Sequence, residues 1–164
     1  MVNRTETPWV VVTGHRPMYS QEIESNDPTM IAALEPLLLA AKVDMVVWGH
    51  DHVYMRSCPI THNGTCADAG TSDPGYTRAG MAPVHVVCGT AGAFRDDMGA
   101  AGSSTAAPWV VSMEACEGCH HWGYCRFVAN ASVLTLEYVG FIGIDNATTA
   151  PSQVLDRYSL TRHA

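Results

Sequence analysis

The sequence predicts an α/β fold in which a βαβ unit is followed by mostly antiparallel strands. Two apolar, β-branched runs at residues 8–14 and 43–49 flank a segment, residues 28–42, whose apolar residues recur at helical spacing. Three later runs alternate apolar and polar residues as antiparallel strands do: residues 122–130, 132–140 and 154–162. Because a chain of 164 residues has room for about one domain, we expect residues 1–164 to form a single domain of this class.

The first part of the chain has the pattern of a βαβ unit. Continuous apolar runs such as 8–14 and 43–49 are typical of strands buried on both faces, and a helix between two strands makes them parallel neighbours. Asp27 is placed to cap the helix, with Pro28 in its first turn. Pro36 lacks the amide proton that an interior helix position needs, so we expect it to kink or split the helix.

The rest of the chain alternates between strands and loops. "PVHVVCGTAGA" (83–93) is a third buried strand that ends in small residues, and residues 61–82 and 95–108 are rich in loop-forming residues. No internal repeat is present in the sequence. We therefore divide the domain into a βαβ part, residues 8–56, and a β-rich carboxy-terminal part, residues 84–164.

Composition and charge exclude two classes of partner. The chain is 47% hydrophobic and 15% charged, as is ordinary for a globular protein, and its formal net charge is −7. Nucleic-acid binding needs clustered basic groups, whereas Lys42 is the only lysine and the arginines are scattered. No apolar run approaches the roughly 20 residues that cross a bilayer. We expect neither a nucleic-acid partner nor a membrane span.

Sequons and cysteines indicate a secreted or lumenal protein. Four Asn-x-Ser/Thr sequons are candidate glycosylation sites: Asn3, Asn63, Asn130 and Asn146. Six cysteines, an even number, are candidates for disulfides: Cys58, Cys66, Cys88, Cys116, Cys119 and Cys125. The amino terminus lacks the basic and apolar regions of a signal peptide, so we expect that a preceding segment is missing from this chain.

The stretch "CEGCHH" (116–121) admits two alternatives to disulfides. Cys-x-x-Cys-His is the attachment pattern of a c-type haem, although no methionine follows it to serve as a distal ligand. A structural zinc knuckle is the second alternative, with ligands from Cys116, Cys119, His120 or His121 and Cys125. Disulfides with surface histidines are the favoured interpretation.

A glycine followed by a histidine ends each of the first two predicted strands. "TGHR" (13–16) follows one strand and "WGHDH" (48–52) follows the next. The carboxyl ends of parallel neighbours meet at one edge of a sheet, where α/β proteins bind their ligands, so His15, His50 and His52 should lie together. A lone histidine is usually a polar loop residue, but three converging imidazoles predict part of a metal site.

These residues belong to an ordered set of motifs that resembles a known family. The motifs are "GHRPMYS" (14–20), "GHDHVYMR" (49–56), "VHVVCGTAGA" (84–93), "WGYCRFVANASVLTLEYV" (122–139) and "VLDRYSL" (154–160). Together they resemble the purple acid phosphatases of the calcineurin-like metallophosphoesterase superfamily. The resemblance is to the carboxy-terminal half of the catalytic domain in the high-molecular-weight type, and it extends over nearly the whole chain.

The resemblance implies an αββα sandwich with a two-metal site for hydrolysis of small phosphate esters. In such sites an iron(III) ion lies beside a divalent Zn, Mn or Fe ion, about 3.5–4 Å away, and the pair activates water and neutralises phosphate. Carried over residue by residue, His15 and His50 would bind the divalent ion and His52 the iron. The resemblance assigns no catalytic side chain in this chain beyond these metal ligands.

The sequence also departs from the family pattern. The family's aspartate and tyrosine ligands and its Gly-Asn-His motif precede the Gly-His-Arg segment, and this chain contains no Gly-Asp and no Gly-Asn dipeptide. We therefore expect a partial domain that is inactive alone and whose main partner is its missing amino-terminal half; the sequence indicates no oligomeric state. The alternative is a non-catalytic extracellular module that retains the fold and binds at most one divalent ion weakly.

Five further residues near these motifs are also considered for a role at the site. Arg16 and Arg56 are candidates for phosphate contact at the rim of the site, although structural ion pairs are the favoured interpretation. Tyr54 is expected to serve packing, His85 to lie in the core or at an edge, and His62 to be solvated in the loop that contains a sequon.

Overall fold

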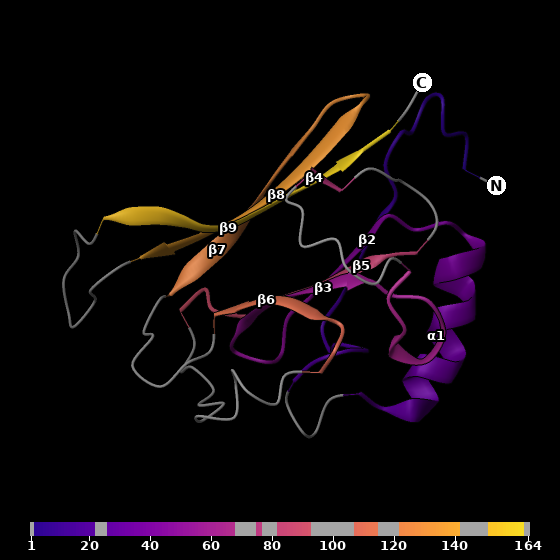
Figure 1. Ribbon diagram of the computed structural model, residues 1–164, viewed down its shortest axis with the longest axis horizontal. Helices are drawn as coiled ribbons and strands as arrows, with labels where there is room; N and C mark the ends of the chain where they lie inside the picture. Colours follow the sequence, from indigo (N-terminus) through magenta and orange to yellow (C-terminus); the bar gives the residue numbers. More distant parts are fainter. Residues whose placement is uncertain are drawn as a thin grey trace.

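The computed structural model describes residues 2–21, 26–67, 75–76, 82–92, 107–114, 122–141 and 151–162. These residues form two β-sheets packed face to face and one helix on the outer face of the first sheet (Figure 1). The α/β class and the βαβ unit followed by antiparallel strands are confirmed. In the described ranges, three layers of the expected αββα sandwich are present, one helical and two of strands.

The elements follow one another in a simple order. They are β1 Val11–Gly14, α1 Pro28–Ala40, β2 Met45–Trp48, β3 Tyr54–Pro59, the 3₁₀ helix η1 His62–Gly64, β4 Gly75–Tyr76, β5 Val84–Cys88, β6 Val110–Glu114, β7 Gly123–Ala129, β8 Val133–Phe141 and β9 Ser152–Thr161.

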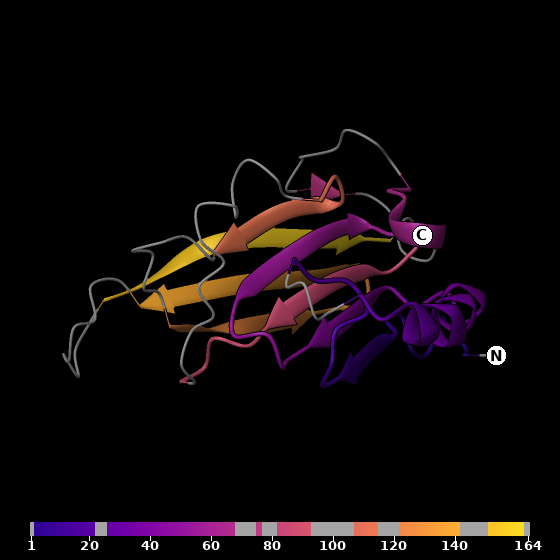
Figure 2. The ribbon, with the colours of Figure 1, turned by 90° about the horizontal axis from the view of Figure 1, so that it is seen from below.

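The five-stranded sheet has the order β1-β2-β5-β3-β6. β1, β2 and β5 are parallel, as predicted for the two strands joined by α1, and β3 and β6 add to the sheet in antiparallel fashion. Figure 2 shows this sheet in front of the four-stranded sheet, with β1 at its lower edge. β3 and β6 were not predicted from the sequence.

The first strand differs from the prediction in its burial. β1 was expected to be buried on both faces, but Val11 is 41% exposed and Thr13 and Gly14 are exposed as well. Within the described residues β1 pairs only with β2 and forms an edge of the sheet. The apolar run identified a strand correctly, whereas its place in the sheet depends on tertiary pairing.

Helix α1 begins as the sequence predicts and continues where a break was expected. The Asp27 carboxylate accepts a hydrogen bond from the Thr29 amide at 2.8 Å. Of the expected kink or split at Pro36, the split does not occur, because α1 is one element from Pro28 to Ala40. The apolar face of α1 packs against the core beneath it. The free energy gained by this burial offsets the cost of the hydrogen bond that proline cannot make.

The second sheet has the order β4-β9-β8-β7, and the β7-β8-β9 part is antiparallel as predicted. Its register places Glu137 of β8 opposite Arg126 on one side and Arg157 on the other. Both arginines form ion pairs with that carboxylate, at 2.5 Å and 2.6 Å. The segment predicted as a loop, 61–82, contains η1 and the short β4.

Two apolar cores hold the layers together. One lies between α1 and the five-stranded sheet and includes Leu38, Val46 and Trp48. The other lies between the sheets and includes Tyr54 and Tyr138, whose rings stack at 4.1 Å. The five-stranded sheet is therefore packed on both of its faces.

Two of the predicted disulfides are present. Cys58 bonds to Cys66 and Cys88 bonds to Cys125, the latter pair linking β5 to β7. Because Cys125 is bonded to Cys88, it cannot serve the proposed zinc knuckle, and that alternative is wrong as stated. Cys116 and Cys119, with the haem alternative, lie outside the described residues. Within the described ranges, no helix is long and apolar enough to cross a membrane.

Candidate metal site at the ends of β1 and β2

The parallel pairing of β1 and β2 brings the two glycine-histidine exits together. The register pairs Gly14 with Trp48, so both strands end at the same level and the histidines follow at the same edge. The Gly49 amide donates a hydrogen bond to the His15 carbonyl at 3.1 Å. One exit is thereby fixed directly to the other.

The His15 and His50 imidazoles are in contact. Nδ1 of His50 lies 3.2 Å from Nε2 of His15, and the ring centroids are 5.0 Å apart with an interplanar angle of 75°. Two nitrogens that bind one tetrahedral zinc ion at about 2.0–2.1 Å are separated from each other by about 3.3 Å. The two ring nitrogens are therefore already spaced as ligands of a single divalent ion.

His50 occupies a backbone conformation that side chains rarely adopt. Its φ is +67°, in the left-handed region, and the Asp51 amide donates to the Gly49 carbonyl at 2.9 Å within the same turn. A left-handed residue other than glycine costs free energy, and such residues concentrate at functional sites. Here this conformation belongs to the residue whose ring meets His15.

The end of β5 supports the turn that carries His50 and His52. A Cβ atom at Gly89 would lie 1.9 Å from the Asp51 carbonyl oxygen, and the Gly89 amide donates to the Val53 carbonyl at 3.0 Å. Only glycine permits this approach. This role of Gly89 was not predicted from the sequence, where the sign of it is a glycine directly after a buried strand.

Comparison with known proteins identifies related sequences for both parts of the chain. The family model for calcineurin-like phosphoesterases matches residues 2–54, and the model for the carboxy-terminal part of iron/zinc purple acid phosphatase-like proteins matches residues 82–149. A purple acid phosphatase from yellow lupin (Lupinus luteus) seeds superimposes with a TM-score of 0.77 and 26% identity over 98% of this chain. In both of its parts the chain is therefore similar to purple acid phosphatases.

Two sequence relatives show how much of a purple acid phosphatase is represented. A protein of Arabidopsis thaliana named probable inactive purple acid phosphatase 9 is 38% identical over 85% of this chain, and an acid phosphatase of Aspergillus ficuum is 40% identical over 56%. The chain spans 21% and 15% of these relatives and 26% of the lupin structure. It thus corresponds to a minor part of each.

The third predicted ligand, His52, follows the imidazole pair in the same turn. His52 follows the buried Asp51 and is half-buried. Within the described residues, no three His, Cys, Asp or Glu side chains come close enough to hold one ion. His52 therefore does not complete a three-residue site with His15 and His50, and the resemblance assigns it to the other ion.

The two candidate phosphate-contacting arginines differ in position. Arg56 is buried between the sheets, where its Nε donates to Asp156 at 2.7 Å and its guanidinium lies 4.6 Å from the Tyr158 ring centroid. Burial opposes the charge of Arg56, yet the hydrogen bond that it donates to Asp156 leaves its pKa raised. Arg56 thus forms the structural ion pair that was the favoured interpretation over contact with phosphate. Arg16 is exposed beside His15 and remains a candidate.

The remaining predicted residues lie away from the imidazole pair. Tyr54 serves packing and donates to Asp156 at 2.6 Å, and His85 is a core residue, 1% exposed. The side chain of His62 is 71% exposed, with its ring 3.2 Å from Glu35. Three sequon asparagines are exposed, namely Asn3, Asn63 and Asn130, whereas Asn146 lies outside the described residues.

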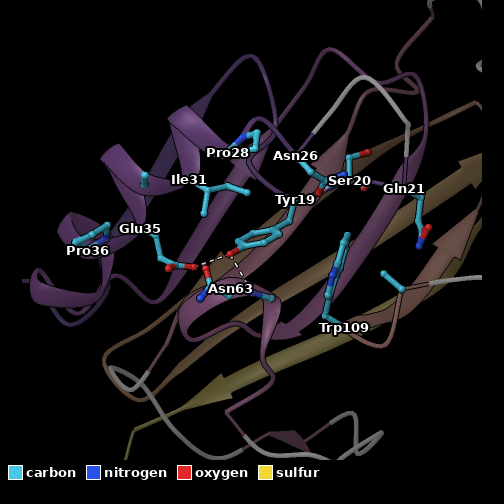
Figure 3. Close-up of a pocket in the computed structure, with 13 residues that line it drawn as sticks. Tyr19, Ser20, Gln21, Asn26, Pro28, Ile31, Glu35, Pro36, Asn63 and Trp109 are labelled. Atoms are coloured by element: carbon cyan, nitrogen blue, oxygen red, sulfur yellow. Dashed lines mark hydrogen bonds between the residues drawn. The ribbon is translucent and has the colours of Figure 1, made fainter.

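A separate pocket of about 530 Å³ lies beside α1. Figure 3 shows Tyr19 between α1 and the loop that carries Asn63, with its hydroxyl directed to Glu35. That hydroxyl donates to the Glu35 carboxylate at 2.5 Å and accepts from the Gly64 amide at 3.1 Å. Burial and the adjacent carboxylate raise the pKa of Tyr19 well above its usual range. The residues that line the pocket include neither His15 nor His50.

Proposed function

We propose that this chain is the carboxy-terminal part of a metal-dependent acid phosphatase domain that hydrolyses small phosphate monoesters. The observation that carries the proposal is the 3.2 Å separation of His15 Nε2 and His50 Nδ1 at the carboxyl edge of a parallel sheet. The names of two relatives, both acid phosphatases, support the reaction class.

The residues present fit the divalent half of a two-metal centre. His15 and His50 would hold the Zn, Mn or Fe ion as neutral imidazoles, and His52 would contribute to an iron(III) ion beside it. Such an ion pair supplies Lewis acidity that activates water and neutralises phosphoryl oxygens. Iron(III) prefers anionic oxygen ligands, and the sequence lacks the family motifs that carry them. We propose that those ligands come from the part of the domain that this chain does not span.

The chain's own residues orient the site. The Gly49–His15 backbone bond and the left-handed His50 fix the backbone that carries the two rings, which reduces the entropic cost of binding. Arg16, exposed next to His15, is the residue that we assign to contact with the phosphate of the substrate. Its guanidinium is suited to bidentate recognition of phosphate oxygens.

A non-catalytic module is the second candidate function. One of the relatives, 38% identical, is named a probable inactive purple acid phosphatase. In that case the imidazole pair would bind one divalent ion weakly and no ester would be hydrolysed. The two candidates differ in whether the fold turns over substrate when its metal ligands are complete.

We also propose that the protein is secreted or lumenal and glycosylated. The two disulfides support an oxidising compartment. The exposed sequons Asn3, Asn63 and Asn130 support access for glycosylation.

Zinc binding and phosphatase activity test the proposal separately. Zinc titration of the full chain should show one site that is lost in His50→Ala and retained in His62→Ala, a histidine away from the edge.

The chain alone, with iron and zinc at mildly acidic pH, should show little or no p-nitrophenyl phosphate hydrolysis. A chimera that carries residues 2–162 in place of the matching segment of the lupin enzyme should hydrolyse it, and His50→Ala should abolish this. A folded, metal-loaded but inactive chimera would favour the non-catalytic module.

A further inference from the structure

One buried aromatic side chain contacts the exits of both β1 and β2. Trp48 is the last residue of β2, directly precedes Gly49 and is 5% exposed. A Cβ atom at Gly14 would lie 2.3 Å from Cζ3 and 2.8 Å from Cε3 of Trp48. The six-membered ring of the indole therefore lies directly against the backbone that precedes His15. Any rotation of this ring would displace the backbone at Gly14 or at Gly49, from which the chain continues to His15 and His50.

A hydrogen bond to His85 holds the indole in place. Nε1 of Trp48 donates to Nδ1 of His85 at 3.1 Å, and the two rings are stacked with an interplanar angle of 19°. Burial lowers the pKa of His85 to about 3, so the imidazole is neutral at physiological pH and Nδ1 can accept. Without this acceptor the indole would bury an unsatisfied N–H group, which costs free energy.

His85 is itself restrained by neighbouring elements. Its backbone amide donates to Oγ of Ser57 on β3 at 2.8 Å. Its ring meets the Tyr19 ring edge-on, with the centroids 5.1 Å apart. Tyr19 belongs to the loop that follows β1, so the chain contacts Trp48 at Gly14, where β1 ends, and His85 further along this loop. The pair thus connects the core of the sheet to the segment that carries the first histidine.

We propose that His85, acting through Trp48, is a positioning residue that sets the separation of the His15 and His50 imidazoles. The inference rests on the proposed function of these two rings as ligands of one divalent ion. A tetrahedral ion needs its two nitrogens about 3.3 Å apart, and the observed separation is 3.2 Å. Groups that orient metal ligands typically change metal affinity by about 10–100-fold when they are removed.

The first test is zinc affinity, measured by competition with a chromogenic chelator on the full chain. His85→Phe keeps an aromatic ring but removes the acceptor, and we expect zinc affinity to fall about ten-fold. His85→Asn restores an acceptor near the place of Nδ1 and should bind zinc within about two-fold of the wild type. His62→Phe is the matched control, because its ring is exposed and distant from Trp48 in the sequence; its zinc affinity should not change.

A second readout needs no metal and separates this inference from the proposed function. In the wild type, a nuclear Overhauser effect should connect the His15 and His50 rings, whose centroids are 5.0 Å apart. His85→Phe should weaken it and move the indole N–H resonance of Trp48, assigned with Trp48→Phe, whereas His85→Asn should preserve both. If the His15 and His50 rings are in contact but the wild type does not bind zinc, the proposed function fails. The effect of His85→Phe on this ring contact still tests the positioning role of His85.

Two outcomes overturn the positioning role. The first is a folded His85→Phe variant with wild-type ring contact and zinc affinity. If His85→Phe does not fold, Trp48→Phe removes the donor instead and must weaken the same ring contact. Wild-type ring contact in a folded Trp48→Phe variant is the second outcome that overturns it.

Discussion

Two polar clusters that share the segment from Gly49 to Arg56 have opposite arrangements. At the exit edge, formed by His15, Gly49–His52 and Gly89, two imidazole nitrogens face each other near the surface and one residue has φ of +67°. In the interface cluster, formed by Tyr54, Arg56 and Asp156, the Asp156 carboxylate accepts three hydrogen bonds between the sheets, at 2.6, 2.7 and 3.0 Å. The exit edge presents two adjacent ring nitrogens that are candidate ligands of an ion, whereas the polar groups of the interface cluster bind one another. Changes at the first should alter ligand binding and changes at the second should alter stability.

The largest expected effect is the loss of stability in Arg56→Met. Removing one partner leaves the Asp156 charge buried and unpaired, which typically costs about 3–5 kcal/mol. The urea midpoint should fall accordingly. Arg126→Met is the matched control, because the Arg126 side chain is 49% exposed in its pair with Glu137, and its midpoint should move far less. Equal shifts in the two variants would contradict the role given to burial.

Gly89→Ala should have the next largest effect. The added methyl would lie 1.9 Å from the Asp51 carbonyl oxygen, so the turn before His52 must move, at a cost of about 3 kcal/mol. Urea denaturation measures the stability, and zinc titration should show weaker binding as well. At Gly49 the nearest atom, Nδ1 of His15, is 3.6 Å from an added Cβ, so Gly49→Ala should be the milder change. A larger loss of stability in Gly49→Ala than in Gly89→Ala would refute the close approach of Gly89 to the Asp51 carbonyl.

The interface cluster should also govern acid stability. Burial alone would raise the pKa of Asp156, but the hydrogen bonds from Arg56 and Tyr54 leave it lowered. A depressed pKa means that the contribution is present above the usual aspartate pKa of about 4 and is lost as pH falls through the folded value. Urea midpoints measured from neutral to acidic pH should therefore fall more steeply in the wild type than in Asp156→Asn. Parallel curves would show that Asp156 is not linked to unfolding.

The smallest expected change in stability is a gain, in His50→Gly. Glycine adopts a φ of +67° without the steric cost of a side chain, so stability should rise by up to about 1 kcal/mol. Zinc binding should be lost at the same time, because the Nδ1 ligand is gone. His15→Gly, at a residue without positive φ, should lose zinc binding with no such gain. A destabilised His50→Gly variant would remove the evidence for strain.

The sequence predicted the local part of the fold well because local patterns determine it. Apolar runs and helical spacing located β1, α1 and β2, and the Asp27 cap is as expected. The same patterns could not show that β1 lies at an edge of the sheet, because edge position depends on which other strands pair with it. Pro36 does not split α1 for a related reason, because the packing of the helix on the sheet outweighs the local preference of proline against a helix interior.

The candidate site was predicted to the extent that its residues repeat one motif. Two Gly-His exits from parallel strands were enough to bring His15 and His50 together. Arg56 was ambiguous because its partner Asp156 is far away in the sequence, and its strand has no alternation of polar and apolar residues. The roles of Gly89 and His85 were not predicted either, because each depends on contacts with a segment that is distant in the sequence.

The Cys88–Cys125 disulfide has a mechanical consequence. It joins β5 to β7 across a sequence separation of 37 residues. Those residues cannot contribute to the contour length when an oxidised molecule is stretched from its ends, which hides about 120 Å of extension at about 3.3–3.6 Å per residue. Under tension the oxidised protein therefore keeps β5 tethered to the second sheet after its hydrogen bonds have broken. Relaxation returns these two strands to each other without a search through the length of the chain between them.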